Sequence, residues 1–201
     1  MKLRSSILFT MAPWLFYFAG EMSGHLALGS GSALLAMLFC QSLGWYRLKW
    51  TDWTQFAFFT IILLAANWPP FKPVLVFRPE LAPGLFLIMT LGSLAMGHPF
   101  TNQFAREQIP ADFWDDPAFP SHFARVNRIL TFAWGINFGV ALACAWIARR
   151  ETSIPPWTFK AIVTGSFIAV GALTRFFPPW YEKHVYLPHR SIQVHSNSLS
   201  R

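Results

Sequence analysis

Charged residues are scarce in this sequence. Lysine, arginine, aspartate and glutamate make up 12% of its 201 residues, whereas about a quarter of the residues in soluble domains are charged. Hydrophobic residues make up 54% of the chain, and the mean hydropathy is +0.36. So little charged surface excludes a water-soluble globular domain of this size.

Cysteine is nearly absent, and the positive charge is not concentrated. Cys40 and Cys144 both lie inside apolar runs, which excludes a disulfide framework and a cysteine-based metal site. The net charge of +7 comes from cations scattered between the apolar runs. We therefore expect no nucleic-acid partner, and we assign the cations to the anionic inner leaflet of a lipid bilayer.

Tryptophan, by contrast, is abundant, with ten residues in the chain. The indole ring has an apolar body and one N–H group, so it favours the headgroup level of a bilayer and forms aromatic belts there. The tryptophans that mark a junction between an apolar run and proline, glycine or charge are Trp14, Trp45, Trp50, Trp53, Trp68, Trp146, Trp157 and Trp180. This placement predicts an integral membrane protein.

The apolar runs predict an all-α fold, a polytopic transmembrane helical bundle of six spans. A span needs roughly 20 residues, and the runs are Ile7–Met22, His25–Trp45, Trp53–Trp68, Leu81–Met96, Ile129–Ala148 and Trp157–Phe177. The first run contains Pro13, so a kinked or half-inserted first helix would leave five spans. It lacks a small-x-small cleavage site, so we interpret it as a retained span rather than a signal peptide.

Residues 1–181 are predicted to form a single transmembrane domain, followed by a polar cytoplasmic tail at 182–201. Basic residues should be more frequent on the cytoplasmic side. With both termini inside, the inner segments contain Lys2, Arg4, Arg47, Lys49, Arg106, Arg125, Arg128, Lys183, Arg190 and Arg201. The outer segments contain only Lys72, Arg78, Arg149, Arg150 and Lys160. This distribution places both termini in the cytoplasm.

The segment 97–128 is the longest one between apolar runs. Its six aromatic residues predict an interfacial cytoplasmic loop that lies on the membrane surface, and they are Phe100, Phe104, Phe113, Trp114, Phe119 and Phe123. Prolines divide the loop, so we expect a short helix at Thr101–Gln108 and a new helix beginning near Pro120.

The polar residues of this loop have two interpretations. They could bind a lipid headgroup or a protein partner, because guanidinium groups match phosphate and carboxylate oxygens, or they could form ion pairs that hold the loop on the bundle. The candidate binding residues are Arg106, Glu107, Asp112, Asp115, Asp116, Arg125, Asn127 and Arg128. The three aspartates resemble a magnesium-binding cluster, but a second acidic motif is missing. We therefore expect no metal and no cofactor.

Small residues predict how the helices pack. Gly135 and Gly139 form a GxxxG pair in the fifth apolar run, and such pairs allow close approach of two backbones in lipid. We expect contact with another helix of the same chain, and a homodimer through this face is the alternative.

The loop also carries a resemblance. Pro99 to Pro110 resembles the PFT-x-Q-[FY]-ARE-Q-x-P signature of a family of small, mostly uncharacterised bacterial inner-membrane proteins. A more distant similarity is to the intracellular septation protein A family, through Gly97 to Phe100, Asn127, Trp134 and the Trp157 to Lys160 motif. The resemblance implies a multi-pass protein of the bacterial inner membrane, and neither family lends catalytic residues.

We expect a non-catalytic role, as an interaction partner, assembly factor or accessory subunit in that membrane. The expected partners are the lipid bilayer and either another membrane protein or a second copy of the chain. The alternative is a lipid-binding protein or membrane enzyme with a headgroup site under the 97–128 loop. We identify no catalytic residues in the sequence.

Overall fold

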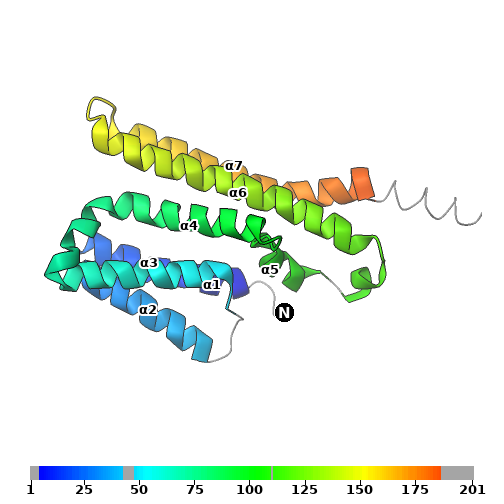
Figure 1. Ribbon diagram of the computed structural model, residues 1–201, viewed down its shortest axis with the longest axis horizontal. Helices are drawn as coiled ribbons and strands as arrows, with labels where there is room; N and C mark the ends of the chain where they lie inside the picture. The colour runs from blue at the N-terminus through cyan, green and yellow to red at the C-terminus, as the bar shows by residue number, and fades with distance from the viewer. Residues whose placement is uncertain (1–4, 43–47, 110, 187–201) are drawn as a thin grey trace, which may run out of the picture.

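The computed structural model describes residues 5–42, 48–109 and 111–186, and this part of the chain is helical, as predicted (Figure 1). Its helices are α1 (Ser5–Met22), α2 (Leu26–Ser42), α3 (Trp50–Asn67), α4 (Arg78–Ala95), α5 (Thr101–Ala105), α6 (Phe119–Arg150) and α7 (Pro156–Tyr181). Short helical turns are η1 (Pro69–Phe77), η2 (Arg106–Gln108), η3 (Ala111–Asp115) and η4 (Glu182–Tyr186). The apolar runs therefore predicted all six long helices.

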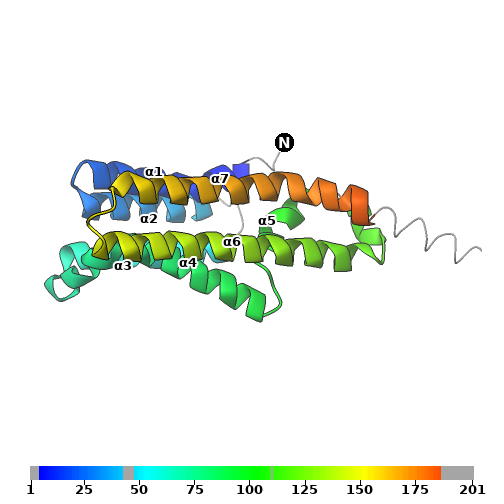
Figure 2. The same cartoon turned by 90° about the horizontal axis from the view of Figure 1, so that it is seen from above.

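The six long helices alternate in direction and lie side by side (Figures 1 and 2). Each helix packs mainly on its neighbours in the order α1, α2, α3, α4, α6 and α7. The α1–α2 turn, η1 and the α6–α7 turn lie at one end of the molecule, which we call the turn end. The starts of α3 and α6, together with α5 and η4, lie at the other, which we call the α5 end.

Three segments are long and apolar enough to cross a membrane: 69–95, 119–150 and 156–186. Most of their apolar residues are not buried inside the protein, and in the last segment only 6% of the apolar part is buried. Apolar surface on this scale is not stable in water. The apolar helix α2 is shorter, with 17 residues. These three segments are therefore the structural evidence that the protein lies in a membrane.

Tryptophan side chains mark both ends of the bundle. Trp68, Trp146 and Trp157 are each about half or more exposed at the turn end. Trp53 and Trp180 are similarly exposed at the α5 end, while Trp45 lies outside the described residues. These positions fit two aromatic belts.

Trp14 is an exception, because it lies in the middle of α1 within the aromatic core. Its ring stacks on Phe58 at 5.3 Å and contacts Phe59 at 5.0 Å between ring centroids. The interpretation of Trp14 as a belt residue was therefore wrong. Pro13 before it is buried, and α1 continues through it without a break. The core around Trp14 is completed by Tyr17, Ala33, Met37 and Ile62.

The closest helix contact is between α1 and α2. A Cβ atom added to Gly20 would lie 2.3 Å from the Cα of Gly29, so the two backbones touch. The turn that follows uses Gly24 at a φ of +78°, a conformation that side-chain-bearing residues rarely adopt. On the outer side of this turn Glu21 pairs with Arg78 at 2.9 Å.

Gly135 and Gly139 have different surroundings. A Cβ atom at Gly135 would lie 3.1 Å from the Cγ2 atom of Thr90, so this glycine allows α6 to approach α4 closely. A Cβ atom at Gly139 would meet nothing within 4 Å. Gly139 instead lines a cavity between α4 and α6.

The Gly20 contact yields a prediction about stability. Gly20→Ala should lower the free energy of unfolding by about 1–3 kcal/mol, because the added methyl group must separate two backbones. Gly165→Ala in α7 is the control, since a Cβ atom there meets nothing within 4 Å. Thermal unfolding of the detergent-solubilised protein measures both. Equal melting temperatures for the two variants would contradict the close packing of α1 on α2.

Candidate functional site

The segment after α4 turns back under the α5 end of the bundle. Gly97 adopts a φ of +72° and ends α4, and the His98 N–H group donates a hydrogen bond to the Ser93 carbonyl at 2.9 Å. The chain then forms α5 and η2, which together cover the predicted helix Thr101–Gln108. The next long helix, α6, begins at Phe119, next to the predicted Pro120.

Buried hydrogen bonds attach α5 to both α4 and α6. The Phe100 N–H group donates to the Ser93 hydroxyl at 3.2 Å, and Phe100 is only 6% exposed. The Thr101 hydroxyl lies 2.9 Å from the Asn127 carbonyl, to which it donates, and 2.8 Å from the Thr131 hydroxyl. Because these groups are buried, each bond that is lost would leave a polar atom without a partner.

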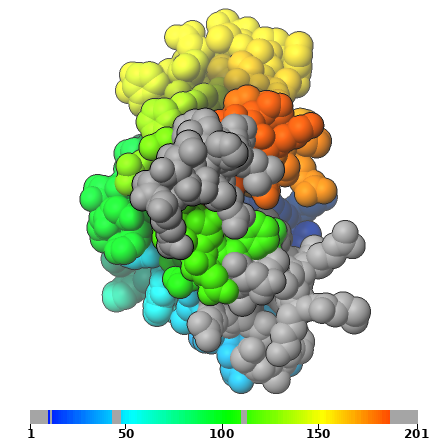
Figure 3. All heavy atoms as spheres, turned by 90° about the vertical axis from the view of Figure 1, so that its right-hand side faces the viewer, coloured from blue at the N-terminus to red at the C-terminus, as the bar shows by residue number. Residues whose placement is uncertain are grey.

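The same short helix also contacts the beginning of α3. The Lys49 ammonium lies 3.1 Å from one carboxylate oxygen of Glu107 and 4.6 Å from the centroid of the Phe104 ring. The Trp50 N–H group donates a hydrogen bond to the Gln103 side-chain oxygen at 2.8 Å. We call Lys49, Asp52, Gln103, Phe104 and Glu107 the α3–α5 junction. Figure 3 shows this end of the molecule, with α5 in green between the cyan and the orange helices.

Asp52 is the buried acid of this junction, and it precedes the apolar run of α3. Its carboxylate accepts a hydrogen bond from the Lys49 N–H group at 2.8 Å, which stabilises the first turn of the helix. Burial raises the pKa of the Asp52 carboxyl to about 6, although the Lys49 N–H group and ammonium oppose this shift. Asp52 is therefore half-protonated near pH 6.

Several buried polar atoms around the junction have no hydrogen-bond partner within the described part of the chain. They include one oxygen of Asp52, the Thr51 hydroxyl and both amide atoms of Gln55. Buried polar groups are paired in most proteins. The beginning of α3 is therefore a buried polar region next to α5.

The structure separates the predicted binding residues into two groups. Glu107 pairs with the buried Lys49, although its own side chain is 36% exposed. Asn127 turns inward, and its amide donates to the Phe123 carbonyl at 2.9 Å. Asp116 accepts a hydrogen bond from the Tyr186 hydroxyl and one from the Ala118 N–H group at 3.0 Å. The residues that point outward are Asp115, Arg106, Arg125 and Arg128. The Asp112 side chain lies outside what the structure describes.

The expected ion pairs between acids and arginines of the loop do not form among the described side chains. Glu107 instead pairs with Lys49, and the Arg106 guanidinium lies 5.1 Å from the Trp114 ring. The loop aromatics also pack on one another. Phe119 lies 5.3 Å from Trp114 and 6.1 Å from Tyr186 between ring centroids. Part of their surface is therefore used within the protein rather than against the membrane.

Our sequence reasoning did not identify Lys49, Asp52 and Gln103 as part of this site. Asp52 had a usable signal, because an acid three residues after a helix cap commonly accepts a hydrogen bond from the cap residue. Lys49 had none, since its partner Glu107 is 58 residues away. No protein family, curated protein or solved structure matches this chain.

The raised pKa of Asp52 yields a prediction about pH. Below about pH 4 the carboxyl is neutral in both the folded and the unfolded state, so its burial does not lower the free energy of unfolding. As pH rises from about 4 to 6, the unfolded state loses its proton first, and the folded state loses stability. Asp52→Asn should remove this contribution. The free energy of unfolding of the Asp52→Asn variant, relative to that of the natural protein, should therefore increase by about 1–3 kcal/mol between pH 4 and pH 6.

Thermal unfolding in detergent between pH 4 and pH 7 tests this expectation. Asp115→Asn is the matched control, because it makes the same change at an exposed aspartate. A difference between Asp52→Asn and the natural protein that does not vary with pH would show that Asp52 titrates at its ordinary value.

Proposed function

We propose that this protein crosses the bacterial inner membrane six times, with both termini in the cytoplasm. The alternating directions of the six long helices support this topology. So does the charge of the connecting segments, because the α5 end receives most of the basic residues outside the spans. The α5 end is then cytoplasmic and the turn end is periplasmic. The resemblance of Pro99–Pro110 to a family of small inner-membrane proteins supports the assignment to the bacterial inner membrane.

Within this topology the protein acts non-catalytically, as an interaction partner, assembly factor or accessory subunit. The observation that carries this proposal is the division of charges in the 97–128 segment. Its inward side chains hold the segment on the bundle, while Arg106, Arg125 and Arg128 are exposed and have no ion pair among the described residues. We call these three residues the arginine surface.

The arginine surface is suited to an acidic partner. Arg125 and Arg128 are three residues apart on α6, so they lie on neighbouring positions of one helix face. The helix that carries them is fixed by the buried bonds of Thr101, so little conformational freedom is lost when a partner binds. An acidic segment of another membrane protein would meet these guanidinium groups at the cytoplasmic surface.

A lipid headgroup is the second candidate for the same surface. Guanidinium groups bind phosphate oxygens in pairs, and Trp114 beneath Arg106 is a residue type common at the membrane interface. The experiment on partner binding below distinguishes the two, because it reports bound protein and bound lipid separately.

The topology has a direct test. Reporter fusions after Trp50 and after Phe77 should report opposite compartments, cytoplasm for the first and periplasm for the second, because α3 separates the two positions. An additional fusion after Glu151 should match the one after Phe77. The same compartment for Trp50 and Phe77 would rule out the six-span topology.

The partner should be lost when the arginine surface is reversed. Purification from native membranes in mild detergent should yield a stoichiometric protein partner. The double variant Arg125→Glu with Arg128→Glu should retain at least about tenfold less of it, because close charge pairs at interfaces contribute about 1.5 kcal/mol or more. Lys72→Glu is the control, since it reverses an exposed charge in η1 at the turn end.

Two other outcomes are informative. A lone protein in every mild detergent would contradict the accessory role. Loss of bound phospholipid in the double variant, with no protein partner in either sample, would favour the headgroup site.

A further inference from the structure

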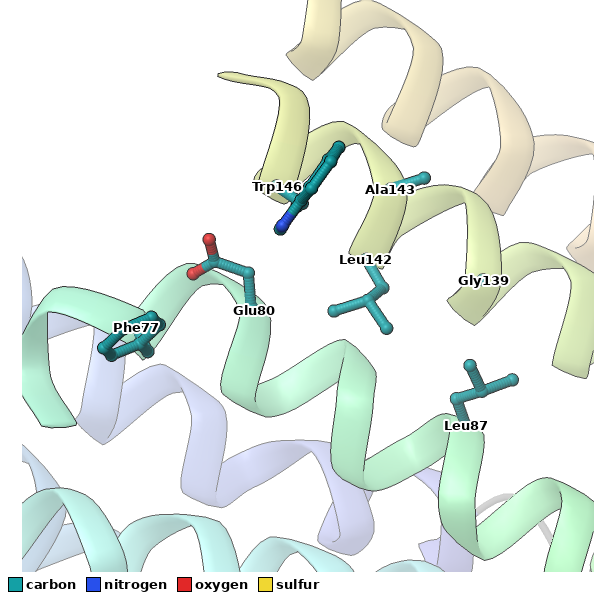
Figure 4. Close-up of a pocket in the computed structure, with 7 residues that line it drawn as sticks. All are labelled: Phe77, Glu80, Leu87, Gly139, Leu142, Ala143 and Trp146. Carbon is teal, nitrogen blue, oxygen red and sulfur yellow. The ribbon is translucent and has the colours of Figure 1, made fainter. Parts of the chain in front are cut away.

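A cavity lies between α4 and α6, near the turn end and away from the arginine surface. Its volume is about 420 Å³. Figure 4 shows Leu87 and Leu142 pointing into it from the two helices, with Glu80 and Trp146 at one end. Gly139 leaves room for it, because a Cβ atom added at this position would have no neighbour within 4 Å.

The two helices that form the cavity belong to two of the three segments able to cross a membrane. A groove between such helices opens to the medium that surrounds them. In a bilayer that medium is the acyl chains of lipids. The leucine side chains and the bare backbone at Gly139 fit one such chain, and they offer it no hydrogen-bonding group.

The polar end of the cavity is formed by an ion pair. Arg149 pairs with Glu80 and also donates a hydrogen bond to the Val76 carbonyl at 2.9 Å. Its guanidinium lies 4.2 Å from the Phe77 ring, so it joins the end of η1 to the end of α6. The Arg149 guanidinium is therefore committed to contacts within the protein.

Two groups at this end remain available to bind a ligand. The second carboxylate oxygen of Glu80, Oε1, is buried and has no hydrogen-bond partner among the described residues. The Arg150 guanidinium lies 3.8 Å from the Trp146 ring, and no carboxylate of the described chain pairs with it. A hydrogen-bond acceptor, Glu80, thus lines the end of an apolar groove, and the Arg150 cation lies against Trp146, which lines the same end.

We propose that this cavity binds one phospholipid molecule whose headgroup donates a hydrogen bond. One acyl chain lies between Leu87 and Leu142, and the phosphate meets the Arg150 guanidinium. The ammonium group of phosphatidylethanolamine, or a headgroup hydroxyl, donates to Glu80 Oε1. The charges are complementary, because phosphate is anionic where Arg150 is cationic, and an ammonium is cationic where Glu80 is anionic.

The Glu80 oxygen also predicts a selectivity. Phosphatidylcholine has the same net charge as phosphatidylethanolamine, but its headgroup has no N–H or O–H group to donate. A buried acceptor without a donor is unfavourable. The site should therefore prefer phosphatidylethanolamine by about tenfold, which corresponds to the loss of one hydrogen bond to a charged group.

The test uses the purified full-length protein in nanodiscs made from equal amounts of the two lipids with identical acyl chains. After transfer to mild detergent, native mass spectrometry should show one retained lipid, mostly phosphatidylethanolamine. Gly139→Leu should reduce retention at least about tenfold by filling the groove. Gly171→Leu is the matched control, since a Cβ atom at that α7 glycine also meets nothing within 4 Å.

Two further variants keep the test decisive if Gly139→Leu does not fold. Arg150→Gln changes an exposed side chain and should weaken retention of both lipids. Glu80→Gln should reduce the preference between them. Equal retention of the two lipids by the natural protein would overturn the proposed headgroup contact. Full retention in folded Gly139→Leu or in Arg150→Gln would overturn the site. These outcomes concern bound lipid at the turn end, so they are independent of the partner at the arginine surface.

Discussion

The contact between Lys49 and Glu107 is the interaction on which the arrangement of the bundle most depends. Lys49 is only 2% exposed, and a buried ammonium without a counter-charge would be strongly destabilising. Glu107 supplies that charge from η2, directly after α5. Since α5 is also bound to α4 and α6 through Phe100 and Thr101, this ion pair links the beginning of α3 to the later helices at the α5 end, in addition to the packing of α3 on α4.

Scarcity of charge makes each such pair important. Nine acidic residues occur in the chain, and three of them form ion pairs among the described residues. Glu21 of α1 pairs with Arg78, and Arg149 of α6 pairs with Glu80, so both α1 and α6 are joined to the first turn of α4. All three pairs lie at helix ends, and in each pair at least one side chain is about a third exposed, which limits the cost of desolvation. The middle of the bundle is held by aromatic and glycine contacts instead.

The fold could be predicted from the sequence where the signal is local. Apolar runs located the long helices, and prolines located the starts of α5 and α6, because both signals depend on neighbouring residues. Contacts between distant residues could not be predicted. Glu21 binds Arg78 rather than the nearby His25. Trp14 follows a proline, as belt residues often do, yet it packs on Phe58 and Phe59 because α1 lies against α3.

The candidate site, like the fold, could be predicted only in part. The 97–128 segment was recognised from its prolines, aromatics and charges, but the direction of each side chain was not. On α6, Asn127 is 1% exposed while its neighbour Arg128 is exposed, because adjacent residues on a helix point about 100° apart. The packing of α6 on α4, α5 and α7 decides which of the two faces inward. Sequence spacing alone therefore could not separate the residues that hold the loop from those available to a partner.

The attachment of α7 follows from the membrane environment. This helix packs mainly on α6 and buries few side chains, and burial against another apolar surface contributes little in lipid. Hydrogen bonds between the helices supply specific contacts: Trp134 donates to the Thr174 hydroxyl at 3.1 Å, and Ser166 donates to the Asn137 side chain at 2.8 Å. At the α5 end, Tyr186 binds Asp116. Asp116 also accepts a hydrogen bond from the Ala118 N–H group just before α6, so one carboxylate links the segment after α7 to the start of the helix that carries Arg125 and Arg128.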